Sequence, residues 1–211
     1  MVRTNVALSL PVHPGLKATA RVPGRALTQD IPTVEFSFLL GMGAVAALAT
    51  VLLDFSLRLP GHAILRTILP MAAGLAFVPR KHAGATMSLG ALMAALGLAL
   101  GGGRLPGAGA ATSLLLTGPL LDLATRQARN GGRVYLGFAL AGLASNSCAL
   151  LVRAAGKLAG IDAMGTRPLG SWLAVALLCY ALCGLAAGLL SGMLCFRLSS
   201  PSALKDEETV A

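Results

Sequence analysis

Charge is scarce in this chain of 211 residues. Only 12% of the residues are Asp, Glu, Lys or Arg, whereas 55% are apolar and the mean hydropathy is +0.77. A typical soluble domain carries roughly 25% charged residues. Because so little charge cannot solvate the surface of a globule, the composition predicts an integral membrane protein. Aromatic residues make up only 4%, and Trp172 and Tyr135 are the best candidates for an interfacial aromatic belt.

Catalytic and metal-binding signatures are also missing. The sequence has no HExxH, GxSxG or Walker A motif, and its four cysteines form no CxxC pair. Asp54, Asp122 and Asp162 are isolated rather than grouped at a metal-binding spacing. We therefore predict no catalytic residue, no metal site and no cofactor, and we predict that the chain is not an enzyme.

Six apolar segments stand out along the chain, and they predict an all-α polytopic bundle of about six transmembrane helices. The segments are residues 36–57, 63–78, 83–100, 107–124, 134–152 and 171–196. The segment 63–78 is the shortest and contains Arg66 and Pro70, so it is either a spanning helix, which we favour, or a re-entrant piece. We expect three regions: a basic flexible arm over 1–33, the six-helix domain over 34–197 and a tail over 198–211.

The net charge of +9 predicts the orientation in the membrane. The basic residues lie between the apolar runs and form no basic face with interleaved aromatics, so we do not expect a nucleic-acid partner. With six spans, both termini share one side, and that side collects eleven of the 17 basic residues. This excess predicts a cell inner membrane protein with both termini in the cytoplasm.

Small residues recur every fourth position in several segments and predict close helix packing in lipid. Two interpretations remain open: packing inside the bundle, or docking of a partner membrane subunit. The candidates for partner docking are Gly43, Ala47, Gly184, Gly188 and Gly192.

Polar side chains inside apolar segments are costly and therefore mark candidate binding residues. Asp54, His62 and Arg66 are expected at the outer ends of the first two segments, and Asn146 lies within the fifth. Either Asp54 pairs with Arg58 and the group anchors the interface, or the group forms a cap or pocket for an anionic or polar solute. Asn146 bonds either a neighbouring helix or a substrate. We expect Asp122 to form a structural pair with Arg126, four residues on.

Two stretches resemble a known family. Residues 107–122 form a small-residue run that leads into Gly118-Pro119 and ends at Asp122, and it is similar to an element of the cobalt- and nickel-type membrane subunits of energy-coupling-factor (ECF) transporters. The turn from Leu59 to His62 resembles Gly/His-containing loops of the same group.

The resemblance implies an S component, the substrate-binding membrane subunit of an ECF-type importer. Its partners would be a small solute such as a vitamin, a transmembrane coupling subunit, ATPase subunits and membrane lipid. The chain starts Met1-Val2-Arg3 and lacks the Met-His start of the metal-type subunits, which argues against cobalt or nickel. The alternatives are a non-transport membrane scaffold or assembly protein, or an intramembrane enzyme of an unrecognised type.

Overall fold

A computed structural model describes residues 31, 33–53, 60–103, 106–127, 131–160 and 169–196 of the chain. This part contains six helices and no strand, as the apolar segments predict. The helices are α3 (Thr33–Leu52), α4 (Ala63–Phe77), α5 (Ala83–Leu100), α6 (Ala108–Gln127), α7 (Gly131–Leu158) and α8 (Leu169–Cys195). The predicted N-terminal arm and C-terminal tail lie almost entirely outside the described residues.

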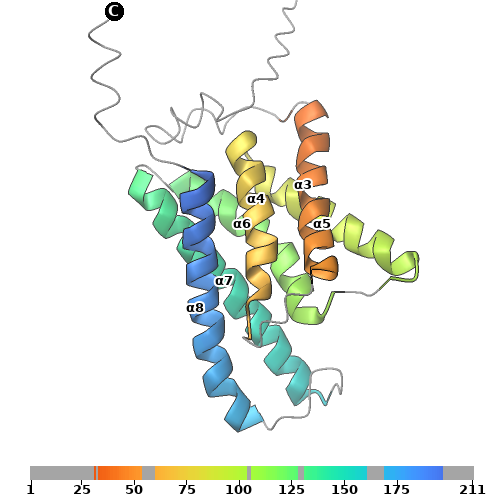
Figure 1. The fold of residues 1–211 in the computed structure, drawn as a ribbon, viewed down its shortest axis with the longest axis vertical. Helices are drawn as coiled ribbons and strands as arrows, with labels where there is room; N and C mark the ends of the chain where they lie inside the picture. The colour runs from red at the N-terminus through yellow and green to blue at the C-terminus, as the bar shows by residue number, and fades with distance from the viewer. Residues whose placement is uncertain are drawn as a thin grey trace, which may run out of the picture.

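The six helices run alternately up and down, so that the start of α3 and the end of α8 lie at the same end of the bundle (Figure 1). Contacts between the helix ends agree with this arrangement. Arg80, which follows α4, donates to the Glu35 carboxylate at the start of α3 from Nε at 2.8 Å and from a terminal nitrogen at 3.0 Å. Tyr135, near the start of α7, donates to the carbonyl of Phe196, just after α8. We call this end the terminal end and the other one the far end.

The helix α4 lies in the centre of the bundle, between α3 and α8 (Figure 1), and contacts each of the other five helices. Eight of its 15 residues are buried, and several of them form the middle of the main hydrophobic core. Pro70 removes one backbone donor from this helix. The neighbouring helices cover its buried residues, whereas Leu65, Leu69 and Phe77 on the same helix are exposed.

Four of the described helices are long and apolar enough to cross a membrane, namely α3, α5, α7 and α8. The apolar helix α4 is shorter, at 15 residues, and α6 does not reach the same apolar character. About six spans were predicted, and four helices meet the requirement by themselves.

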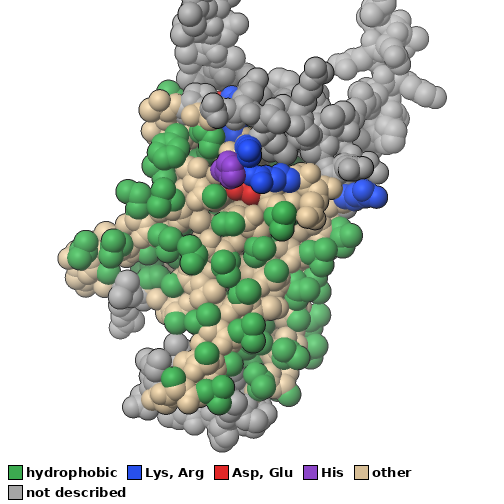
Figure 2. Space-filling model, turned by 180° about the vertical axis from the view of Figure 1, so that it is seen from behind, with side chains coloured by type: hydrophobic (Ala, Val, Ile, Leu, Met, Phe, Trp, Pro, Cys, Tyr) green, Lys and Arg blue, Asp and Glu red, His purple; other side chains and the backbone are tan. Residues whose placement is uncertain are grey.

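The outer surface of the helices is apolar. Leu177, Leu178 and Leu182 on α8 are each more than half exposed, as are Leu96 and Leu100 on α5. Figure 2 shows hydrophobic side chains over most of one face, with Lys, Arg and His side chains gathered near one end of it. Exposed leucines over whole helices are costly in water and suit a lipid environment.

Glycines lie at the points where neighbouring helices come closest to each other. A Cβ on Gly43 would lie 1.9 Å from the carbonyl oxygen of Met87 on α5, and one on Gly188 would lie 2.1 Å from that of Phe138 on α7. The glycine pairs Gly84/Gly118 and Gly142/Gly184 join α5 to α6 and α7 to α8 in the same way. Such distances leave no room for any side chain, so these helices pack backbone to backbone.

This packing also involves the residues that were named as candidates for partner docking. Gly43, Gly184 and Gly188 face helices of their own chain, and a Cβ on Gly192 would lie 3.3 Å from the Tyr135 ring. Ala47 is fully buried. Of the two interpretations left open, the structure therefore favours packing inside the bundle for all five residues, because their small surfaces are already covered.

Polar contacts tie helix ends together at the terminal end. The Asp122 carboxylate accepts hydrogen bonds from the backbone N–H groups of Gly84 and Ala85, at 2.8 and 2.9 Å. It thus caps the start of α5, where backbone donors lack partners within the helix. Arg126 instead reaches the ring of His82. The predicted Asp122–Arg126 pair is therefore wrong as a direct ion pair, although both residues stabilise the bundle.

Arg80 lies in the same region, outside the helices, and its contact with Glu35 is an ion pair. Its hydrogen bonds to that carboxylate raise the pKa of Arg80 further above its usual value. This ion pair holds the turn after α4 against the first turn of α3.

Candidate functional site

A cavity of about 330 Å³ lies at the far end of the bundle. Its wall comes from the turn before α4, the first turns of α6, the second half of α7 and the first half of α8. The lining residues are Pro60, Gly61, His62, Ala63, Gly107, Ala108, Gly109, Ala110, Ser113, Asn146, Ala149, Arg153 and Tyr180. Its volume is at the lower end of the range for small-molecule sites, roughly 300–1,000 Å³.

Asn146 joins three parts of this wall. Its amide nitrogen donates to the carbonyl of Gly61 at 3.1 Å and to the carbonyl of Tyr180 at 2.7 Å. The residue is 2% exposed. Of the two interpretations left open for Asn146, these contacts match a bond to neighbouring segments; the residue also lines the cavity, and a bond to a substrate stays a prediction.

Gly61 permits this close contact. Its φ of +86° is a left-handed conformation that side chains rarely adopt, and a Cβ there would lie 3.0 Å from the Asn146 amide nitrogen. The Pro-Gly-His turn therefore folds directly onto α7 and α8, and it places His62 in the cavity wall.

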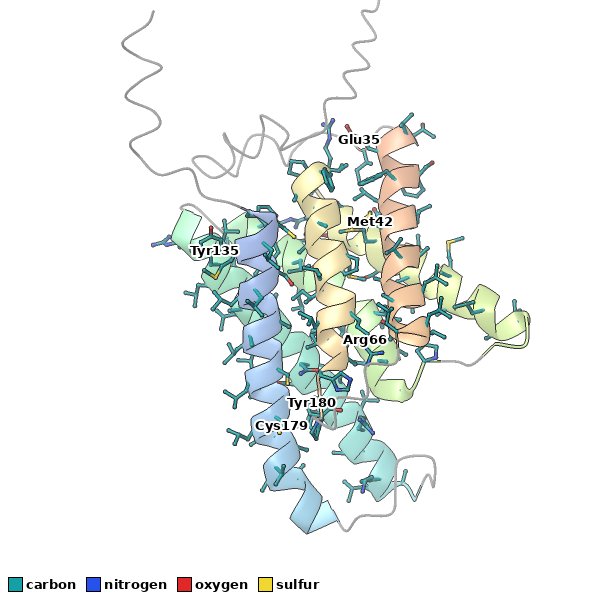
Figure 3. The ribbon with its side chains drawn as sticks, viewed as in Figure 1. Glu35, Met42, Arg66, Tyr135, Cys179 and Tyr180 are labelled. Carbon is teal, nitrogen blue, oxygen red and sulfur yellow. The ribbon has the colours of Figure 1, made fainter. Side chains whose placement is uncertain are left out.

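Arg153 and Tyr180 form the charged side of the cavity. Arg153 donates to the Tyr180 hydroxyl oxygen at 2.9 Å. Its aliphatic part crosses over α6, because a Cβ on Gly109 would lie 2.9 Å from its Cδ. The Tyr180 side chain is directed into the bundle from α8, near the far end (Figure 3), and the residue is only 3% exposed.

Arg66 lies beside the cavity rather than in its wall. Its guanidinium approaches Nε2 of His62 at 2.8 Å and donates to the carbonyls of Thr50 and Leu53 at the end of α3. Figure 3 shows Arg66 on α4 beside the lower end of α3. Basic side chains commonly cap the free carbonyls of a helix C-terminus. Arg66 therefore holds the start of α4 against α3 and also positions His62.

The site residues predicted from the sequence thus lie in different places. His62 and Asn146 lie together in one cavity, Arg66 is one contact away from it, and Asp54 lies outside the described residues. Sequence reasoning missed Arg153 and Tyr180. A useful signal was present for Arg153, since a basic residue that follows the apolar segment 134–152 lies at the same end as the turn around His62.

A second buried polar contact lies deeper in the bundle. The hydroxyls of Thr117 and Ser145 are 2.8 Å apart and join α6 to α7. Both residues are fully buried, so this contact satisfies two polar groups that would otherwise be costly in an apolar interior. It fixes the relative height of the two helices that supply most of the cavity wall.

The part of the chain that the structure describes contains no cluster of metal-binding side chains. No three His, Cys, Asp or Glu side chains come together there. The four cysteines are all free thiols within α7 and α8.

Comparison with known proteins gives no relative. No family model matches the chain, and no curated protein and no solved structure is similar to it. The function must therefore be argued from the cavity and its residues.

Proposed function

We propose that this chain is the substrate-binding membrane subunit of an ECF-type importer. It captures a small solute in the far-end cavity and delivers it with the help of a coupling subunit and ATPase subunits. The observation that carries the proposal is the cavity itself, with buried Asn146 and Tyr180 and half-buried Arg153 in its wall. A few polar groups converging in a mainly apolar cavity are typical of small-molecule sites.

The resemblance adds support, because the two stretches that carry it lie side by side. The turn Pro60–His62 and the first residues of the run 107–122 are both in the cavity wall, although more than 40 residues separate them in the sequence. An arrangement that only packed the bundle would not require both to border one cavity.

Orientation follows from the charges. The six helices all cross the membrane in this proposal, with α4 and α6 shielded by the more apolar four. The terminal end faces the cytoplasm, since its side has the larger share of basic residues. The cavity then opens toward the outside, as an importer requires.

The test is purification of the full chain in a mild detergent, followed by native mass spectrometry. We expect a small molecule to remain bound to the wild type, and Asn146→Leu to remove it by placing a bulky apolar group in the cavity wall. Gly41→Ala is the matched control, because nothing lies within 4 Å of a Cβ at Gly41. A wild-type protein that carries no small molecule and purifies from its own cells without ATPase subunits would favour the scaffold function instead.

A further inference from the structure

The orientation of the Asn146 amide is fixed by its partners. Two carbonyl oxygens, those of Gly61 and Tyr180, can accept only from the NH₂ group, so the carboxamide cannot be turned over. Its Oδ1 accepts no hydrogen bond from the described residues. An acceptor that borders a cavity can take a hydrogen bond from a bound molecule.

Tyr180 and Arg153 bring hydrogen-bond donors to the cavity. Tyr180 accepts from Arg153, which leaves the hydroxyl hydrogen of Tyr180 without an acceptor in the described part of the chain. A guanidinium has five N–H groups, and the contact with Tyr180 uses one of those of Arg153. The cavity therefore offers hydrogens from two side chains that already lie 2.9 Å apart.

Backbone donors lie at the same place. The first intrahelical bond at the start of α6 runs from the N–H of Ala111 to the carbonyl of Gly107. The N–H groups of the preceding residues have no acceptor within the helix. Gly109 is among these residues and packs against Arg153. These donors add to the positive potential that Arg153 creates on this side of the cavity.

The charge of the wall is one-sided. Among the described residues that line the cavity, Arg153 is the permanently charged side chain, and none is a carboxylate. A single guanidinium balances one negative charge, which suits a carboxylate better than a phosphate that carries nearly two.

We propose that the solute is a small organic monoanion, with a carboxylate held by Arg153 and Tyr180 and an N–H or O–H group that donates to Oδ1 of Asn146. This inference rests on the proposed function, since it assigns the chemistry of the molecule that the cavity takes. The volume of about 330 Å³ limits the solute to a compact molecule.

Three probes of matched shape test the two contacts separately. They are 4-aminobenzoate, which has both groups, benzoate, which lacks the donor, and 4-aminobenzamide, which lacks the charge. Binding to the full chain in lipid nanodiscs is measured by saturation-transfer NMR. Hydrogen bonds to charged groups justify an expected loss of about 10- to 100-fold in affinity for the amide relative to the acid. Benzoate should bind about 3- to 10-fold more weakly than 4-aminobenzoate.

Variants then identify the residues responsible. Arg153→Gln should reduce the preference for the acid over the amide to about threefold or less, and Arg153→Lys should restore part of it. Tyr180→Phe retains the ring and should weaken the acid by about 3- to 10-fold. Arg126→Gln removes a cation from the terminal end and is the matched control, for which an unchanged preference is expected.

The outcomes separate this inference from the proposed function. If the amide binds as well as the acid, or if Arg153→Gln keeps the preference, the monoanion assignment is wrong while solute capture stands. If no probe binds, the charge of the molecule that co-purifies tests the monoanion assignment. An anion would support the assignment, and a neutral or cationic molecule would overturn it. Absence of both probe binding and a co-purified molecule overturns both proposals.

Discussion

The contact between α7 and α8 can be tested by adding one methyl group. Gly188 on α8 lies so close to α7 that a Cβ there would be 2.1 Å from the carbonyl oxygen of Phe138 and 2.8 Å from the Cα of Ala139. Both neighbours are backbone atoms, so no side chain can rotate to make room. Gly188→Ala must therefore push the two helices apart.

The size of the effect follows from these distances. Close carbon–oxygen contacts in proteins lie at roughly 3.3–3.6 Å, so the helices must separate by about 1.2 Å at this point. Such a gap forfeits dispersion energy along the whole contact, and overpacking changes of this kind cost about 1–3 kcal/mol. The higher helix propensity of alanine relative to glycine offsets at most about 1 kcal/mol of this loss in stability.

Gly41→Ala provides the comparison, because it makes the same chemical change in the interior of α3 where nothing lies within 4 Å. We expect this variant to be as stable as the wild type or up to about 1 kcal/mol more stable. Equilibrium unfolding by SDS in mixed micelles, followed by circular dichroism, measures both free energies of unfolding. Equal stability of the two variants would refute the backbone-to-backbone contact of α7 with α8.

Three further predictions concern the terminal end and the orientation. Asp122→Ala should lower the free energy of unfolding by about 2–3 kcal/mol in the same assay, because it leaves two backbone N–H groups of α5 without their carboxylate; a loss under about 0.5 kcal/mol would contradict the cap. A double-mutant cycle with Glu35→Gln and Arg80→Gln should give a coupling free energy of about 0.5–1 kcal/mol, since the ion pair is partly exposed. A coupling of zero would mean that this ion pair does not stabilise the contact between the turn after α4 and α3. In a cysteine-free background, a cysteine at position 104 should react with an impermeant reagent in intact cells and one at position 129 should not; the reverse labelling would invert the proposed orientation.

Much of the architecture could be predicted because apolar helices correspond to continuous apolar runs in the sequence. The segments 83–100 and 63–78 match α5 and α4 to within one residue at each end. The other helices depart further from their apolar runs. The helix α7 extends beyond the segment 134–152 at both ends, from Gly131 to Leu158, whereas α3 begins before residue 36 and ends at Leu52, before residue 57.

The site was predicted in part, for a comparable reason. His62 and Asn146 attracted notice because each is polar in or beside an apolar segment, and both line the cavity. Arg153 and Tyr180 were not predicted as site residues, because a basic residue near the end of an apolar segment and a tyrosine within one are common in membrane proteins. The 2.9 Å contact between them depends on how α7 packs against α8.

The amino-acid sequence by itself indicated a lipid environment and the six apolar helices of the described residues, since both follow from local hydrophobicity. The spacing of its small residues also predicted close helix packing, but it did not identify the neighbouring helices. Only the tertiary structure decided which helices meet, because glycine spacing is the same on a face that packs internally and on one that binds a partner. The same holds for the cavity: residues 61, 109, 146, 153 and 180 become one site only when four segments pack at the far end of the bundle.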